Sequence, residues 1–393
     1  MVPYNYKNKE TNKKGITSNP FSIMKIVHIF WSLKYGGIET LLINIANAQN
    51  KKGNDVTIII VNDYIDQKLL SQLDKEVHFI CLKRKMHSLF PSFVFSLNKQ
   101  IKDIAPDIIH LHNSAFFPLL KKQYRSRCCC TLHALPYGKM SRSKILPQFL
   151  FSLPGIIKGN VNAIDKIPKV FCISEAVQKA LYDNYEVHGI TIKNGILVET
   201  FNKKNKFSLQ KNFNIVTVGR LNHFEKGQDL LINAIFNLKK NNKSPVKVYI
   251  IGEGESRKYL EELIEKLKLQ DTIYLCGSKD QNFLKANLCN YDLFIQPSRV
   301  DGFGLTVVEA MCANVPVLVS SGQGPEEITQ GNKYGWVFSN GNIPDLEKMI
   351  QYIICHTNEA EVKSEQACAY AKKYFSIEYT ANEYIKNYKL LLK

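Results

Sequence analysis

Two successive blocks of short apolar segments, each segment followed by a stretch long enough for a helix, set the strongest limit on the fold of this chain. The segments are nearly continuous in hydrophobicity, as expected for parallel strands that helices cover on both faces. The first block comprises Lys25–Phe30, Val56–Val61, Val77–Leu82, Ile108–His112, Cys128–His133 and Val170–Ile173. The second comprises Asn214–Gly219, Val246–Ile251, Thr272–Cys276, Leu293–Gln296 and Val315–Ser320. The pattern predicts an α/β protein with two doubly wound, Rossmann-like domains that face each other across a cleft.

The domain boundary is expected where the composition changes. The chain has 393 residues, which exceeds the roughly 250–300 residues at which one hydrophobic core stops growing. A segment rich in Lys and Asn, at 194–211, follows the first block. We therefore predict an N-terminal domain over residues 24–195, a C-terminal domain over 196–378, and a helix over 379–393 that crosses back to the N-terminal domain. Residues 1–23 are polar and are predicted to be a disordered or misannotated leader, with Met24 as the alternative start.

The net charge of +17 is concentrated in the predicted N-terminal domain. Residues 24–195 hold 23 Lys and Arg against 12 Asp and Glu, a net charge of +11, whereas residues 196–393 carry +3. Such a field attracts nucleic acid, an anionic membrane or an anionic substrate, and charge alone does not choose among them. Because zinc-ligand spacing and nucleic-acid recognition motifs are missing, we predict no nucleic-acid partner. The ten cysteines form no Cys-x-x-Cys pair, which favours reduced thiols in a cytoplasmic protein.

Two cations follow the first strand of the second block. Arg220 ends that strand, and Lys226 opens the next helix six residues later. Open α/β sheets bind ligands at the carboxyl ends of their strands. A planar guanidinium and a point-charge ammonium together suit a diphosphate. A competing interpretation, two solvated basic residues on a loop, stays open at this stage.

A glycine-rich segment before another predicted helix is a candidate anion site. Gly302 and Gly304 permit close backbone approach. The peptide N–H groups of a helix's first turn have no partner within the helix, and they attract anions together with the helix dipole. Asp301 and Glu309 are eight residues apart, so both can line one cleft and hold sugar hydroxyls; the alternative is an N-capping aspartate and a surface glutamate. The first-turn residues are Phe303, Gly304, Leu305 and Thr306.

In the first block, Gly36 and Gly37 link the first strand to its helix and allow a ligand to approach the helix N-terminus. His110 and His112 end one strand and are expected to be structural. His133 ends the next strand, at the carboxyl edge that faces the predicted cleft. No metal site is predicted, because the sequence has no Asp-x-Asp, no H-E-x-x-H and no carboxylate that shares the spacing of these histidines.

Taken together and in this order, the motifs resemble glycosyltransferase family 4, the retaining enzymes of the GT-B fold. They are G-G-I-E at 36–39, T-L-H at 131–133, V-G-R at 218–220 with K-G at 226–227, and D-G-F-G-L-T-V-V-E-A-M at 301–311. The resemblance runs from about residue 24 to about residue 378.

The resemblance implies a role for each matched residue. Arg220 and Lys226 would bind the donor diphosphate, Gly37 would lie near it, and His133 would lie near the donor sugar. Glu309 stands at the second glutamate of the family's E-x7-E motif, which holds the ribose. Asp301 stands at the first, which contacts the donor hexose, and is one methylene shorter. The backbone groups that would hold phosphate and sugar belong to Gly302, Phe303, Gly304, Leu305 and Thr306.

These roles predict a metal-independent, retaining hexosyltransferase that needs no cofactor besides its nucleotide-sugar substrate, with UDP favoured. We expect it to transfer a hexose or N-acetylhexosamine to a glycan acceptor, lipid-linked, in surface polysaccharide synthesis (O-antigen, capsule or lipopolysaccharide). A nucleotide-sugar epimerase of the same fold is the alternative. Basic residues around the apolar stretch Ile145–Ile157 predict peripheral association with the anionic inner face of the cell membrane. They are Lys121, Lys122, Arg125, Arg127, Lys139, Arg142, Lys144 and Lys158.

Overall fold

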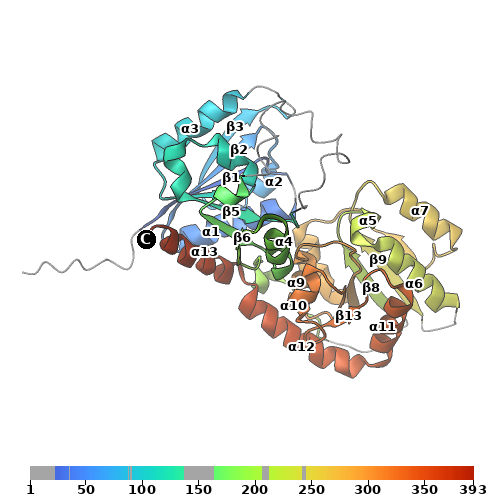
Figure 1. Ribbon diagram of the computed structural model, residues 1–393. Helices are drawn as coiled ribbons and strands as arrows, with labels where there is room; N and C mark the ends of the chain where they lie inside the picture. Colours follow the sequence, from blue (N-terminus) through green and yellow to red (C-terminus); the bar gives the residue numbers. More distant parts are fainter. Residues whose placement is uncertain are drawn as a thin grey trace, which may run out of the picture.

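The computed structural model describes residues 23–34, 36–86, 88, 91–136, 163–205, 212–240 and 245–393. Figure 1 shows two lobes, the first coloured blue to green and the second yellow to red, with the last helix returning to the first lobe. Each lobe contains one parallel β-sheet. The predicted α/β class with two doubly wound domains is therefore confirmed.

The sheet of the N-terminal domain has seven strands in the order β3-β2-β1-β4-β5-β6-β7. Its central strands are buried along nearly their whole length, because helices cover both faces of the sheet. The strands are β1 Lys25–Phe30, β2 Asp55–Asn62, β3 His78–Arg84, β4 Ile108–Leu111, β5 Cys128–Leu132, β6 Lys169–Cys172 and β7 Ile190–Thr191.

Four α-helices of this domain are described. They are α1 Gly37–Lys51, α2 Gln67–Leu70, α3 Ser92–Ile104 and α4 Glu175–Tyr185. Helix α1 buries one apolar face, which includes Leu41, Leu42 and Ile45. Short 3₁₀ turns complete the connections at Ser114–Leu119, Lys122–Arg127, Ile164–Lys166 and Val198–Thr200.

The sheet of the C-terminal domain has six strands in the order β10-β9-β8-β11-β12-β13. The strands are β8 Phe213–Val218, β9 Val246–Ile251, β10 Ile273–Leu275, β11 Leu293–Gln296, β12 Val317–Ser320 and β13 Trp336–Phe338. The helices are α5 His223–Lys226, α6 Gln228–Lys240, α7 Arg257–Lys266, α8 Gln281–Asn287, α9 Leu305–Cys312, α10 Gly324–Thr329, α11 Ile343–Cys355 and α12 Thr357–Tyr374, with a 3₁₀ turn at Leu288–Asn290.

The C-terminal helix α13, Ile377–Leu391, packs against α1 of the first domain (Figure 1). It begins after Ser376, whose side chain accepts a hydrogen bond from the N–H of Tyr379 and caps the helix. Its side chains Tyr384 and Tyr388 are fully buried. The end of the chain therefore contributes to the core of the domain in which the chain begins.

The two domains are packed together on the inner side. The largest apolar cluster joins strands of the first sheet to residues of the second domain, including Phe303, Val307 and Met311. Within the described residues, no helix combines the length and apolarity needed to span a bilayer. The stretch Ile145–Ile157 and four of its basic neighbours, Lys139, Arg142, Lys144 and Lys158, lie outside the described residues.

Candidate active site

The N-termini of two helices, one from each domain, meet at the inner edges of the sheets. Helix α1 begins at Gly37, and α9 begins at Leu305; neither has a side-chain cap. A Cβ placed on Gly37 would lie 3.2 Å from Leu305 Cδ1, so the two helix ends are in contact range. In the described part of the chain, the N–H groups of Gly304, Leu305 and Thr306 donate no hydrogen bond. Two positive dipole ends and free donors together make this a candidate anion-binding site.

The loop before α9 requires glycine at Gly304 and lies against the first domain at Gly302. Gly304 has φ +97°, a left-handed conformation that favours glycine, and it forms the N-cap of α9. A Cβ on Gly302 would lie 3.6 Å from Ala134 Cα, the residue after His133. The end of β5 in the first domain therefore lies directly against the glycine-rich loop of the second.

Lys226 and Asp301 pair with each other. Lys226 Nζ lies 2.8 Å from Asp301 Oδ2, and the two side chains are 21% and 10% exposed. The same oxygen accepts hydrogen bonds from Gln296 Nε2 at 3.1 Å and Ser298 Oγ at 3.3 Å. Asp301 Oδ1 accepts the N–H of Phe303 at 3.3 Å. Asp301 thus binds both the Lys226 ammonium and the backbone of Phe303, in the loop before α9.

Arg220 lies on the loop after β8 and is exposed. Its carbonyl accepts hydrogen bonds from the Asn222 N–H at 2.8 Å and from Gln228 Nε2 at 2.9 Å, so the backbone of this loop is fixed. Among the described residues, its guanidinium has no hydrogen-bond or ion-pair partner. Gly227, with φ +66°, ends α5 against the Pro297 carbonyl, and a Cβ there would overlap that oxygen.

Glu309 lies in the second turn of α9 and is only half satisfied. Its Oε1 accepts from Gln281 Nε2 at 2.8 Å, whereas its Oε2 is buried without a partner among the described residues. Burial raises the pKa of this carboxyl to about 7. A buried carboxylate with one unpaired oxygen needs a hydrogen-bond donor, and the hydroxyls of a sugar or ribose supply such donors.

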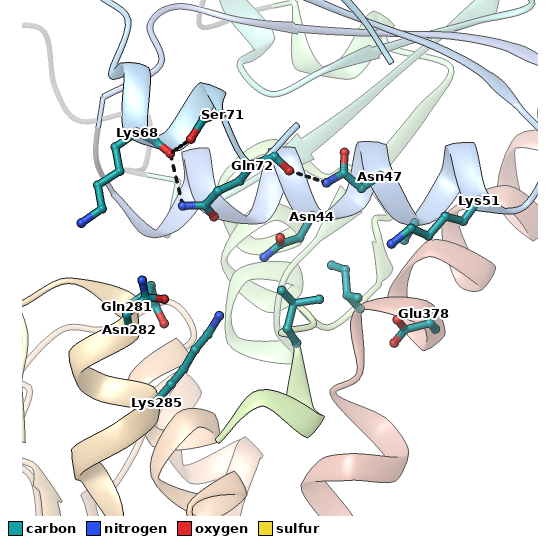
Figure 2. A pocket seen from close by; sticks show the side chains of 13 residues that line it. Asn44, Asn47, Lys51, Lys68, Ser71, Gln72, Gln281, Asn282, Lys285 and Glu378 are labelled. Carbon is teal, nitrogen blue, oxygen red and sulfur yellow. Dashed lines mark hydrogen bonds between the residues drawn. The ribbon is translucent and has the colours of Figure 1, made fainter. Parts of the chain in front are cut away.

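A polar pocket of about 420 Å³ extends from Gln281 along the gap between the domains. Figure 2 shows Asn44, Asn47 and Lys51 of α1 on one side and Gln281, Asn282 and Lys285 of α8 on the other. Lys68 of α2 also lines the pocket, and its Nζ lies 2.6 Å from Asp280 Oδ2 of the second domain. The wall of the gap opposite α8 is therefore built by the first domain.

His133 lies at the end of β5, with one ring nitrogen bonded and the other not. Its Nε2 is 2.9 Å from His112 Nδ1, and its Nδ1 is buried without a partner among the described residues. Burial lowers the pKa of His133 to about 4, so the ring is neutral.

Three further imidazoles lie close together near His133, and the distances between their nitrogens are short enough for one metal ion to be bound by all three. One nitrogen from each of His28, His110 and His112 lies within 4.8 Å of the others. Every ring nitrogen of the three is already in a hydrogen bond. The His110 and His112 rings stack with an interplanar angle of 20°, so their in-plane lone pairs do not converge on one point. In this arrangement the imidazoles bind their neighbours rather than an ion.

Several side chains of the site were not predicted from the sequence. Three glutamines that no sequence motif indicated form hydrogen bonds with the site. Gln281 donates to the Glu309 carboxylate and Gln296 donates to the Asp301 carboxylate. The side-chain oxygen of Gln323 accepts the N–H of Asp301. Glu327 of α10 accepts the N–H groups of Glu175 and Ala176 at 2.7 and 2.6 Å, and so joins the domains at the start of α4.

The chain matches two family patterns that together span most of its length. Residues 35–199 match Glycosyltransferase Family 4, and residues 198–373 match Glycosyl transferases group 1. A Klebsiella pneumoniae protein, an uncharacterized 41.2 kDa protein in the cps region, is 25% identical over 93% of this chain and 99% of its own length. The poly(ribitol-phosphate) alpha-N-acetylglucosaminyltransferase of Staphylococcus aureus is 29% identical over 53% of this chain and 42% of its own length.

Among solved structures, Anabaena HepE in complex with UDP and glucose superposes with a TM-score of 0.74 at 19% identity, over 93% of this chain and all of that one. Two parallel-sheet domains that pack on their inner sides are the GT-B fold, and the two family matches make the chain a glycosyltransferase of this type. The chain belongs to glycosyltransferase family 4.

Proposed function

We propose that this enzyme is a retaining, metal-independent hexosyltransferase that uses a UDP-sugar donor. It transfers a hexose or N-acetylhexosamine to a glycan acceptor that is lipid-linked, in the synthesis of a surface polysaccharide. It acts in the cytoplasm, at the inner face of the cell membrane.

The observation that carries the proposal is a grouping of three features. The free N–H groups at Gly304–Thr306 and the unpaired Oε2 of Glu309 lie at the start of α9 and in its second turn, and Lys226, at the end of α5, is held beside them by its pair with Asp301. A nucleoside diphosphate supplies the complement: anionic oxygens for the cation and the helix N-terminus, and two ribose hydroxyls for the carboxylate. Arg220, exposed on the neighbouring loop, adds a second cation for the diphosphate.

The chemistry follows from this grouping. The bond between the anomeric carbon and the diphosphate oxygen breaks, and negative charge develops on the leaving diphosphate. Arg220, Lys226 and the start of α9 stabilise that charge, which is the task a metal performs in other transferases. The acceptor oxygen attacks the same face of the sugar and forms the new bond, while its proton passes to the leaving diphosphate.

The donor and acceptor classes rest on relatives and on charge. The HepE structure was determined with UDP and glucose, the Staphylococcus aureus relative is an N-acetylglucosaminyltransferase, and the Klebsiella relative is encoded in a cps region. The basic excess of residues 24–195 favours an anionic surface or acceptor next to the first domain.

A donor panel tests the proposal. The protein is incubated with UDP-, GDP- and dTDP-sugars, with and without excess EDTA, and nucleotide release is measured. We expect slow hydrolysis of one UDP-hexose or UDP-N-acetylhexosamine, unaffected by EDTA, and release of the sugar with the anomeric configuration of the donor. Release of a C2-epimerised sugar would support the epimerase instead, and loss of activity that Mg²⁺ or Mn²⁺ restores would contradict metal independence.

A further inference from the structure

A continuous row of hydrogen bonds joins Gln49, in the middle of the first domain, to His133 at the cleft. Gln49 Oε1 lies 2.7 Å from His28 Nε2, and His28 Nδ1 lies 2.9 Å from His112 Nε2. His112 Nδ1 lies 2.9 Å from His133 Nε2. Gln49, His28 and His112 are 0%, 0% and 4% exposed, so water does not compete for these bonds.

Each link of this row fixes the next, because a neutral imidazole has one N–H donor and one acceptor nitrogen. The amide oxygen of Gln49 only accepts, so His28 carries its proton on Nε2 and accepts at Nδ1. His112 must then donate from Nε2 and accept at Nδ1. By the same rule His133 donates from Nε2, which leaves its Nδ1 unprotonated.

The orientation of Gln49 is itself held from the other side. Its Nε2 donates to the hydroxyl of Tyr388 at 3.3 Å, and that hydroxyl lies 2.6 Å from His110 Nδ1. Tyr388 belongs to α13, the helix that returns from the second domain. Rotating the Gln49 amide by half a turn would reverse every proton in the row, so Gln49 selects between two proton orders.

We propose that Gln49 is a positioning residue that fixes the tautomer of His133, through His28 and His112, so that His133 Nδ1 accepts a hydrogen bond from a hydroxyl of the bound donor sugar. The tautomer does not depend on the ligand, whereas the identity of that ligand rests on the proposed function.

Two observations support this role. His133 Nδ1 is buried and has no partner among the described residues. The next residue in the chain, Ala134, lies against Gly302, in the glycine-rich loop before α9. Burial also lowers the pKa of His28 to about 4 and that of His112 well below its usual range. Each ring therefore carries a single proton at neutral pH, as the row requires.

The first test uses the unmodified enzyme and needs no substrate. With ¹⁵N-labelled histidine, long-range proton–nitrogen spectra distinguish protonated from unprotonated ring nitrogens, and a His133→Asn variant identifies the signals of His133. We expect protonated Nε2 and unprotonated Nδ1 at His133, His112 and His28. A protonated Nδ1 at His133, or one transition-metal ion bound per chain by these rings, would overturn the proposal.

The second test changes the anchor. Gln49→Glu presents only acceptor oxygens and should keep the tautomer of His133, whereas Gln49→Leu should give a mixture of both tautomers. Turnover of the UDP-sugar should fall roughly five- to tenfold in Gln49→Leu, the loss expected for one neutral hydrogen bond, and recover in Gln49→Glu. The affinity for UDP, which lacks the sugar, should not change. Equal turnover in the two variants would contradict the role of Gln49.

Two matched tyrosine variants on α13 distinguish a change of tautomer from a general loss of folding. Tyr388→Phe removes the acceptor that orients Gln49, whereas Tyr384→Phe removes a hydroxyl that bonds Thr131 at 3.1 Å and does not contact Gln49. Both tyrosines are fully buried. Mixed tautomers at His133 in Tyr388→Phe alone support the proposal; identical spectra in both variants oppose it. Correct tautomers in an enzyme that cleaves no nucleotide sugar would refute the proposed function and leave the row intact.

Discussion

Lys226 Nζ and Asp301 Oδ2 lie 2.8 Å apart, so the cation expected to hold the diphosphate is paired with the carboxylate expected to hold the sugar. A nucleoside diphosphate must therefore compete with Asp301 for Lys226. Asp301 would remain satisfied if Lys226 moved, because Gln296, Ser298 and the Phe303 N–H also donate to it. The pair keeps Lys226 close to the anion-binding loop before the donor arrives.

Removing the charge of Asp301 should separate nucleotide binding from turnover. We expect Asp301→Asn to bind UDP at least as tightly as the unmodified enzyme, because Lys226 is released, while sugar transfer falls about tenfold or more. Calorimetry with UDP and steady-state kinetics measure the two effects. Asp229→Asn is the matched control, since Asp229 pairs with Arg299 at 2.7 Å in the same domain. Much weaker UDP binding in Asp301→Asn would show that UDP and Asp301 do not compete for Lys226.

The two cations should matter for catalysis more than for folding. Arg220→Ala and Lys226→Ala should each lower kcat by ~10²–10³, the usual effect of losing one electrostatic stabiliser of a leaving group. Arg220→Ala should leave the melting temperature unchanged, because the side chain is exposed and has no partner among the described residues. Lys258→Ala is the control, because the Lys258 side chain on α7 is 87% exposed. Near-normal rates in both site variants would rule out their assigned role.

The sequence predicted most strands because buried parallel strands are short, apolar and nearly continuous. Lys25–Phe30, Val246–Ile251 and Leu293–Gln296 have the predicted bounds. Strands β7 and β13 were missed. They have two and three residues, too few for a hydrophobic pattern to stand out from the surrounding loops.

The site was partly predictable for a related reason. The loop after β8 and the start of α9 lie at carboxyl ends of strands, so their residues could be placed at one edge from strand order alone. The partners of those residues could not. His28 and His112 are 84 residues apart, and His110 and Tyr388 are 278 apart. Such bonds depend on which strand lies beside which, and single-residue expectations for His110 and His112 contain no such information.

Membrane binding should depend on charge in the first domain. We expect binding to anionic liposomes that falls steeply with salt, because each Lys or Arg near the surface contributes roughly 1 kcal/mol and is screened within ~8 Å at physiological salt. Replacing Lys139, Arg142 and Lys144 together by Glu should weaken it, as sedimentation with anionic and neutral vesicles would show. A triple Glu variant on the second domain at Lys258, Lys266 and Lys268 is the control. Equal pelleting with both lipids would exclude an electrostatic surface contact.

Acid should destabilise the enzyme through its buried imidazoles. Burial lowers the pKa of His28 from 6.5 to about 4, so between these values the unfolded chain binds a proton that the native state excludes. The stabilising contribution is complete above pH 6.5 and is lost as pH falls, by roughly 2 kcal/mol for this residue at pH 5. Urea unfolding at pH 7.5 and 5 measures it. His28→Gln should flatten the pH dependence, whereas His78→Gln, whose side chain is 70% exposed, should not; the same slope in both variants would contradict the mechanism.

The buried carboxylate of Glu309 should destabilise the enzyme without nucleotide, and nucleotide binding should remove this destabilisation. Its pKa is raised from 4.5 to about 7 by burial, so ionisation destabilises the fold as pH rises through this range. At pH 8 we expect Glu309→Gln to raise the free energy of unfolding by up to roughly 3 kcal/mol. The same change should weaken UDP binding about ten- to a hundredfold, because the ribose hydroxyls lose a charged acceptor.

The pH dependence of binding gives the sharper test of Glu309. Ribose hydroxyls favour the ionised carboxylate, so UDP affinity of the unmodified enzyme should increase from pH 6 to pH 8 more than that of Glu309→Gln. The phosphate of UDP also titrates near pH ~6, equally in both proteins, and the comparison removes it. Glu327→Gln is the control, since both oxygens of Glu327 accept N–H groups at the start of α4 and its loss should destabilise the fold. A Glu309→Gln variant that is less stable at pH 8 and binds UDP normally would assign Glu309 to the fold rather than to the nucleotide.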